Sequence, residues 1–437
     1  MLRSNRLQHY SSVITEHNDL VQVGKVSKLV GLIIESQGPV AKLGDLCLIT
    51  SSEGKQIYGE VVGFRDQSLL IMPFHDMSGI SPGCLVTSLG HPLRVGVGPK
   101  LLGRVLDGLG NPIDGRGPLE FEEYRSVQNQ CLQPLERHLI SEPLSVGVRA
   151  IDGLLTCGKG QRLGIFAGSG VGKSTLLGMM ARNTEAEINV IALIGERGRE
   201  VREFIEKDLG PEGLARSVVV VATSDQGALI RLKGAMTATT IAEYFRDRGK
   251  NVLFMMDSVT RFAAAQREIG LASGEPPATR GYPPSVFSLL PKLLERTGPG
   301  KNGTITAFYT VLVDGDDYNE PIADSVRSIL DGHIVLSRKL AHQQHYPAID
   351  VLASVSRVMS AVTTAEHQQL AAMLKQRLAT YREAEDLINI GAYIRGANPH
   401  IDDAIAYIDK INNYLKQPAN QASNWDEALS LLQDCMA

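Results

Sequence analysis

The sequence predicts an α/β protein with a largely parallel central sheet, preceded by an all-β domain and followed by a helical one. Three observations predict this order. Short apolar runs separated by turn residues come first, apolar runs that alternate with helical stretches follow, and amphipathic helical spacing ends the chain. The 437 residues also exceed what a single small core accommodates, so we expect several domains.

The first 18 residues form a polar segment that carries Leu7, Tyr10 and Ile14 at helical spacing. Two interpretations of residues 1–18 stay open. They form either a short amphipathic helix that docks on a partner, or a frayed terminal tail.

Residues 19–90 are predicted to form a small β-barrel. Apolar segments of strand length recur about every ten positions, and Gly38-Pro39, Gly54 and Pro82-Gly83 lie between them. These segments are Lys28–Ile34, Asp45–Thr50, Tyr58–Phe64 and Leu69–Met72.

Residues 91–363 are predicted to form the α/β domain. Its first part, His91–Pro143, is rich in Gly and Pro and is predicted to wrap between domains. Strand-like runs then alternate with helical stretches, which implies a largely parallel sheet with helices on both faces. The predicted strands are Arg162–Phe166, Val190–Ile194, Ser217–Val221, Val252–Met256, Thr304–Val311 and His333–Leu336.

Residues 364–437 are predicted to form a helical C-terminal domain. Thr363 and Glu366 have the spacing of a capping box, which marks the start of a helix. A single apolar stripe follows at helical spacing, made of Leu370, Met373, Leu374, Leu378 and Tyr381.

The composition excludes several classes of protein. The hydrophobic fraction of 43% and the charged fraction of 21% are ordinary for a soluble globular protein, and the longest apolar runs have only strand length. We see no leader sequence, so any role at a membrane is expected to be peripheral. The five cysteines are scattered, which favours reduced thiols of the cytosol over a disulfide framework or a zinc site. A net charge of −4 gives no overall attraction to nucleic acid.

The segment 167–174, with the sequence AGSGVGKS, follows a predicted strand and opens a predicted helix. It departs from the phosphate-binding pattern G-x-x-x-x-G-K-[ST] only by Ala167 in place of the first glycine. Backbone N–H groups and the helix N-terminus are expected to bind phosphate oxygens. Lys173 is expected to reach the β- and γ-phosphates, and the Ser174 hydroxyl to bind Mg²⁺. The predicted nucleotide-binding residues are Gly168, Ser169, Gly170, Val171, Gly172, Lys173, Ser174 and Thr175. The alternative is a glycine-rich turn without a ligand.

Two carboxylates follow predicted strands and are therefore expected at the same edge of the sheet. Asp257 ends the run Val252–Met256, and it suggests a Mg²⁺ ligand or, alternatively, the N-cap of a helix. Glu196 follows Val190–Ile194 and could orient the attacking water near the γ-phosphate. From spacing alone, the charged run around Glu196 is as consistent with a solvated turn as with catalysis.

At these residues the sequence resembles the rotary ATPase α/β superfamily and, within it, the type III secretion ATPases, over about residues 21–415. The resemblance implies a RecA-like P-loop nucleotide-binding domain that uses ATP and Mg²⁺. Its motifs are Gly195–Glu200, Met256–Arg261, Gly274–Phe287, Arg327–Val335 and Pro347–Asp350 leading to Ser354–Arg357.

The resemblance also implies a role for individual residues. Glu196 is similar to the carboxylate that positions water, and Arg197 and Arg261 to charged supports around the phosphates. Tyr346 is similar to the aromatic residue that packs on adenine. Arg357 is similar to an arginine finger that acts on the next subunit, which implies a homohexameric ring.

Within this superfamily the sequence resembles most the flagellum-specific ATPase, and the ATPase of a virulence-type injectisome is the alternative. The segments that favour the flagellar branch are Gly158–Ser174, Glu203–Gly210, Ala238–Arg246, Arg327–His333 and Leu387–Tyr393. The resemblance implies a cytoplasmic enzyme at the inner face of the membrane, peripheral to it. Its partners would be an export gate, chaperone–cargo complexes, a stator-like regulator at residues 1–18 and a central stalk at Gly270–Pro284. The alternative for Gly270–Pro284 is a long connection without a partner.

Three rival functions are weighed against this interpretation. An RNA translocase would carry aromatic residues among basic ones in its barrel, but Tyr58, Phe64 and Phe74 are widely spaced. A catalytic subunit of a rotary ATP synthase would require a second related chain. A non-hydrolysing structural subunit conflicts with the joint presence of Lys173, Glu196 and Arg357.

Overall fold

The computed structural model describes residues 22–313, 315 and 317–437. The described chain divides into two compact units, 22–93 with 271–275 and 94–270 with 276–437. The predicted helix or tail at residues 1–18 lies outside the described residues. No helix in the described part of the chain is both long enough and apolar enough to cross a lipid bilayer.

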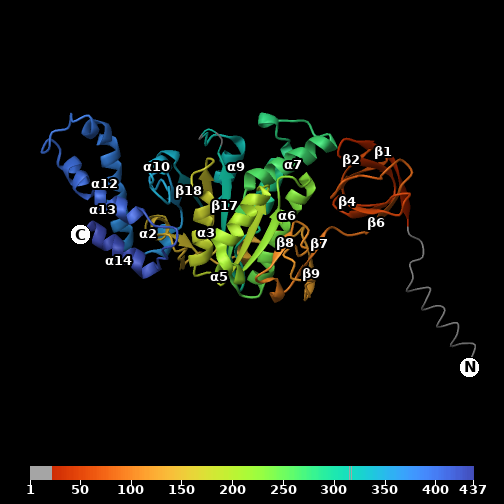
Figure 1. The fold of residues 1–437 in the computed structure, drawn as a ribbon, viewed down its shortest axis with the longest axis horizontal. Helices are drawn as coiled ribbons and strands as arrows, with labels where there is room; N and C mark the ends of the chain where they lie inside the picture. The colour runs from red at the N-terminus through yellow and green to blue at the C-terminus, as the bar shows by residue number, and fades with distance from the viewer. Residues whose placement is uncertain (1–21, 314, 316) are drawn as a thin grey trace, which may run out of the picture. The chain divides into compact units, whose positions relative to one another are not determined.

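The first unit contains a closed antiparallel barrel in the order β1-β2-β5-β4-β3-β6, which confirms the predicted β-barrel (Figure 1). Its interior is filled by Val26, Ile34, Ile49, Val61 and Ile71, all buried. The strands are β1 (Val23–Val30), β2 (Ile33–Gln37), β3 (Leu46–Thr50), β4 (Gln56–Arg65), β5 (Ser68–Pro73) and β6 (Leu85–Ser88).

One predicted strand of the barrel is divided in the structure. The apolar segment Lys28–Ile34 contains a tight turn between β1 and β2, where Gly31 has a φ of 57°. Glycine adopts this left-handed conformation without the steric cost that a side chain would add. The apolar pattern alone therefore predicted one strand where a glycine turn separates two.

The second unit is built on a nine-stranded sheet in the order β19-β18-β12-β17-β15-β13-β14-β8, with β16 paired to β17. All seven residues of β13 are buried, and successive side chains point to opposite faces, so both faces of the sheet are covered. All six predicted strands are present and pair in parallel. The strands are β8 (Val105–Asp107), β12 (Arg162–Ala167), β13 (Ile188–Ile194), β14 (Ser217–Ala222), β15 (Asn251–Asp257), β16 (Gly298–Pro299), β17 (Thr304–Leu312), β18 (Gly332–Leu336) and β19 (Val355–Ser356).

The segment His91–Pro143, predicted to be a connection, contributes more structure than its composition suggests. It supplies the edge strand β8, which pairs in parallel with β14, and an antiparallel pair of β7 (Arg94–Val97) with β9 (Glu123–Ser126). Short strands in a Gly- and Pro-rich stretch are stabilised by their neighbours in the sheet, so local composition does not reveal them.

Helices connect the strands of the second unit. The longest, α6, packs against β13, β14 and β15. These helices are α2 (Arg149–Leu154), α3 (Lys173–Asn183), α4 (Gly198–Glu203), η3 (Phe204–Leu209), α5 (Gly210–Ala215), α6 (Ala228–Asp247), α7 (Val259–Ser273), α8 (Pro284–Leu294), α9 (Pro321–Ile329), α10 (Arg338–His342) and α11 (Met359–Val362), with short 3₁₀ turns at Pro99–Leu101, Pro134–Glu136 and Thr279–Gly281.

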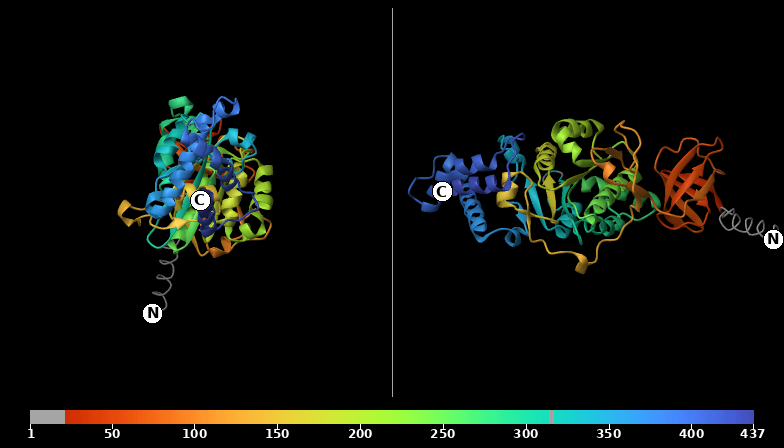
Figure 2. Two further views of the ribbon diagram at one scale, coloured as in Figure 1. Left: turned by 90° about the vertical axis from the view of Figure 1, so that its left-hand side faces the viewer. Right: turned by 90° about the horizontal axis from the view of Figure 1, so that it is seen from below.

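The chain ends in three helices, α12 (Ala365–Asn389), α13 (Pro399–Leu415) and α14 (Trp425–Met436), which lie together beside α2 (Figures 1 and 2). The predicted stripe faces inward, because Leu374 and Leu378 are buried and Leu370 and Met373 pack against them. These side chains share one apolar core with the sheet. The helical C-terminal region is therefore confirmed, and it is packed directly on the α/β domain.

The predicted capping pair of α12 is wrong by one residue. The N-cap is Thr364, whose hydroxyl accepts a hydrogen bond from the backbone N–H of His367. The Thr363 hydroxyl instead donates to the carbonyl of Met359. Adjacent threonines have the same capping chemistry, so spacing could not distinguish them.

Candidate active site

The loop between β12 and α3 leaves the carboxyl edge of the sheet and leads into the N-terminus of a helix. Gly170 and Gly172 have φ values of 77° and 88°, a conformation that favours glycine. The loop ends at Lys173, the first residue of the eleven-residue helix α3. A helix N-terminus with free N–H groups attracts anions, so this geometry suits the phosphates predicted to bind here.

Lys173 and the two predicted carboxylates meet at this edge of the sheet. The Nζ atom of Lys173 lies 2.5 Å from Oδ1 of Asp257 and 3.6 Å from Oε1 of Glu196. Their side chains are 12%, 4% and 17% exposed, so the cluster is largely shielded from water. The carboxyl ends of β12, β13 and β15 thus bring together three residues that are up to 84 positions apart.

A fourth member of this cluster, Thr310, was not predicted from the sequence. The hydroxyl of Thr310, on β17, donates a hydrogen bond of 2.7 Å to Oδ1 of Asp257. The only signal was a polar residue inside the apolar run Thr304–Val311. Thr310 reaches Asp257 only because β17 lies next to β15, and this strand order could not be predicted from the sequence.

Burial and charge shift the protonation of this cluster. Burial, followed by the charge of Asp257, raises the pKa of Glu196 to about 7, although Lys173 acts in the opposite direction. Burial lowers the pKa of Lys173, but the charges of Asp257 and Glu196 outweigh it and the net pKa is raised. Lys173 therefore stays cationic at neutral pH, and Glu196 can take up or release a proton there.

The predicted Mg²⁺ ligands have suitable chemistry. The exposed hydroxyl of Ser174 lies in the first turn of α3, next to Thr175. Asp257 uses only its Oδ1 atom in hydrogen bonds with described residues, so Oδ2 is available. Hydroxyl and carboxylate oxygens are the donors that Mg²⁺ prefers, and this donor set fits the ion.

Tyr346 lies beside the phosphate-binding loop. A Cβ atom placed on Gly172 would come within 3.3 Å of the Tyr346 ring, so the two residues are in close contact. A cavity of about 570 Å³ opens here, and its walls include Ser169, Gly170 and Tyr346. Tyr346 is 40% exposed, which leaves room for a planar ligand against its ring.

Arg197 and Arg261 flank Glu196. Arg197 is the N-cap of α4 and forms a loose ion pair of 3.6 Å with Glu200. The aliphatic part of Arg261 covers Gly195, where a Cβ atom would lie 2.8 Å from that of Arg261. The Arg261 guanidinium makes no ion pair within the described chain. Arg261 is thus free to meet a further negative charge, and Arg197, whose side chain is exposed, is held only by the loose ion pair with Glu200.

Arg357 lies away from this cluster, at the opposite end of the sheet. It follows β19, whose Ser356 pairs with Gly332 at the start of β18, whereas Leu336 at the end of β18 is level with Ala167. From Gly332 to Leu336 the strand rises by about 13 Å, so Arg357 and the end of β12 are separated by about that distance along the strand direction. Arg357 is exposed, and its guanidinium forms no hydrogen bond or ion pair among residues that the structure describes.

Comparison with known proteins matches three parts of the chain to family models. Residues 147–356 match the nucleotide-binding domain of the ATP synthase alpha/beta family, and residues 26–90 match its beta-barrel domain. Residues 363–434 match the T3SS EscN ATPase C-terminal domain.

Relatives match nearly the whole chain. The flagellum-specific ATP synthase of Bacillus subtilis (strain 168) is 59% identical over 94% of both chains. The type 3 secretion system ATPase of Xanthomonas euvesicatoria is 54% identical over 94% of this chain and 93% of its own. The solved structure of the assembled ATPase EscN from enteropathogenic E. coli superposes with a TM-score of 0.90 at 50% identity, covering 95% of this chain and 100% of the solved EscN chain.

Proposed function

The chain belongs to the ATP synthase alpha/beta family, as one of its flagellar and type III secretion ATPases, and we propose that it hydrolyses ATP to energise flagellar protein export. The observation that carries the proposal is the cluster of Lys173, Glu196 and Asp257 beside the phosphate-binding loop. A chain that had lost hydrolysis would have no need to keep this cluster together.

The proposed site binds ATP through the loop 168–172 and the first turn of α3. Lys173 forms ion pairs with Glu196 and Asp257 in the structure. When ATP is bound, it would contact the β- and γ-phosphates instead, because they carry more negative charge. Ser174 and Asp257 would hold Mg²⁺, which neutralises charge on the phosphate oxygens when bound. Tyr346 would pack on the adenine ring.

Glu196 is proposed as the residue that orients the attacking water and accepts its proton. A carboxylate does this best when its pKa is close to the working pH. Its pKa of about 7 meets that requirement, because burial and Asp257 disfavour its charge. Arg197 and Arg261, on either side, would support the developing negative charge on the phosphates.

Arg357 is proposed to act on the γ-phosphate of the neighbouring subunit. Within one chain about 13 Å of strand separates it from the level of the phosphate-binding loop, so it does not complete its own site. Its exposed guanidinium would complete the next one, as arginine fingers do. A closed ring of identical subunits, proposed as a homohexamer, would then be the active form.

The flagellar branch is proposed over a virulence-type injectisome because the relative at 59% identity is a flagellum-specific ATP synthase. The injectisome stays the alternative, since a type 3 secretion ATPase is 54% identical. EscN has also been solved in complex with its central stalk EscO, and we propose a comparable stalk contact at Gly270–Pro284. The export gate, chaperone–cargo complexes, a stator-like regulator and peripheral location at the membrane belong to the same proposal.

The decisive experiment replaces the wild-type chain in its cells by Glu196→Gln. The variant is expected to bind ATP, hydrolyse it at least about 100-fold more slowly and leave hook protein and flagellin inside the cell. Glu203→Gln, on the exposed surface of α4, is the matched control and should secrete normally. Normal flagellar secretion by Glu196→Gln would reject the flagellar role, and loss of virulence-type effectors instead would indicate an injectisome.

A further inference from the structure

The backbone of Tyr346 is held by a residue of the C-terminal region. Its carbonyl oxygen accepts a hydrogen bond of 2.9 Å from the backbone N–H of Gln417. Gln417 lies in the connection between α13 and α14 and is only 2% exposed. The residue predicted to meet the adenine ring is therefore tied to a buried point more than 70 positions later in the chain.

The side chain of Gln417 is itself fully anchored. Its Oε1 atom accepts from the backbone N–H of Arg149 at 2.9 Å. Its Nε2 group donates to the carbonyls of Gly147 and Gln421, both at 2.9 Å. Gly147 and Arg149 lie at the start of α2, so one amide fixes this connection to the α/β domain. Buried amides with all partners in place are held rigidly, because any displacement leaves polar groups unsatisfied.

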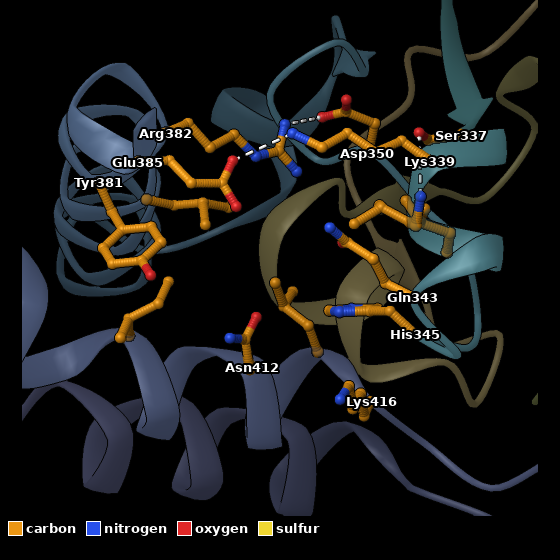
Figure 3. Close-up of a pocket in the computed structure, with 15 residues that line it drawn as sticks. Ser337, Lys339, Gln343, His345, Asp350, Tyr381, Arg382, Glu385, Asn412 and Lys416 are labelled. Carbon is orange, nitrogen blue, oxygen red and sulfur yellow. Dashed lines mark hydrogen bonds and ion pairs between the residues drawn. The ribbon is translucent and has the colours of Figure 1, made fainter. Parts of the chain in front are cut away.

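The segment that carries Tyr346 has further ties to the same helices. A pocket of about 300 Å³ separates residues 337–350 from α12 and α13, and two ion pairs cross it at one side (Figure 3). Arg382 on α12 contacts Asp350 at 2.7 Å, and Glu385 contacts Lys339 at 3.0 Å. Both ion pairs are partly exposed and contribute little by themselves. Gln417 is the buried attachment.

We propose that Gln417 is a positioning residue for the nucleotide base. By fixing the carbonyl of Tyr346, it keeps the ring in place over Gly172, so the base finds its stacking partner already oriented. This inference rests on the proposed role of Tyr346. It adds that the connection between α13 and α14 influences the affinity for ATP through the base, and not through the phosphates.

The experiment compares ATP with inorganic tripolyphosphate, which has phosphates but no base. Gln417→Leu keeps the side-chain volume and removes its three hydrogen bonds. We expect the KM for ATP to rise about tenfold, the size of a lost aromatic–base contact, while kcat and the inhibition constant of tripolyphosphate stay within about twofold. Gln421→Ala, in the same connection, is the control and should change neither value.

A second comparison separates positioning from a general role in stability. Because Gln417 acts through Tyr346, the double variant Tyr346→Ala/Gln417→Leu should have the same KM as Tyr346→Ala alone. Additive effects, or weaker binding of tripolyphosphate as well, would overturn the inference. Should Gln417→Leu not fold, Gln417→Asn takes its place, because it keeps an amide but is one methylene too short to reach all three partners. It should raise only the KM for ATP, and an unchanged KM for that folded variant would reject the inference.

The proposed role of Tyr346 is tested in the same series. If Tyr346→Ala itself leaves the KM for ATP unchanged, the base-binding role of Tyr346 fails, and the inference about Gln417 falls with it. If Tyr346→Ala raises the KM while a folded Gln417→Leu does not, only the inference about Gln417 fails.

Discussion

Glu196 shows how a single side chain acquires its chemistry from its surroundings. Its side chain is 17% exposed, and the nearby charges have opposite signs, with Asp257 favouring its proton and Lys173 its ionised form. Burial and Asp257 prevail, so the pKa is raised to about 7. Glu200 adds to this shift through a hydrogen bond and its charge. The residue that is proposed to take a proton is therefore poised to do so near neutral pH.

The dependence of kcat/KM on pH tests this at the residue scale. Glu196 accepts a proton only when ionised, so kcat/KM should fall about tenfold for each pH unit below about 7. Glu200→Gln removes an influence that raises the pKa of Glu196, so this acid limb should move to lower pH. Glu203→Gln, which lies one turn further along, should leave the profile in place. A limb that does not move in Glu200→Gln would contradict the assigned cause.

At the scale of elements, the proposed site residues lie where parallel strands end. Lys173, Glu196 and Asp257 all follow parallel strands, whose carboxyl ends meet at one edge. Their convergence was predictable, because each follows an apolar run of strand length. The start of α12 was less predictable, since two adjacent threonines compete for one cap.

Thr364 provides the prediction at this scale. Thr364→Ala removes the acceptor for the His367 N–H and should lower the free energy of unfolding by about 1 kcal/mol. Thr364→Ser keeps a capping hydroxyl and should restore most of that loss. Urea denaturation followed by circular dichroism measures both variants. If serine proves no better than alanine, the cap is not the cause of the loss.

At the scale of the whole molecule, the proposed site residues fall into two groups that lie apart within one chain. The phosphate-binding loop lies at the carboxyl edge of the sheet, and Arg357 lies near the start of β18. An exposed arginine without a partner in the described chain suits a neighbouring subunit. This placement is the structural argument for a ring, and the assembled EscN structure is consistent with it.

Mixed assemblies test whether Arg357 acts between subunits. Arg357→Ala should still bind ATP but lose at least about 1,000-fold in hydrolysis. Mixing it with Glu196→Gln, which is also inactive, should restore activity. In a mixed ring some sites combine an intact Glu196 with an intact Arg357 from the neighbour. Two inactive proteins that stay inactive after mixing, although they assemble together, would place Arg357 and Glu196 in one subunit's site.

The sequence by itself determined the order of the domains, the phosphate-binding loop and the residues that follow the strands. Local periodicity and glycine spacing carry that information, because they act over a few neighbouring residues. Only the tertiary structure decided that Thr310 supports Asp257, that Gln417 holds Tyr346, and that Arg357 lies far from its own loop. Each of these depends on strand order or on contacts between distant segments. Such contacts form when the chain packs into one core, and no local pattern specifies them.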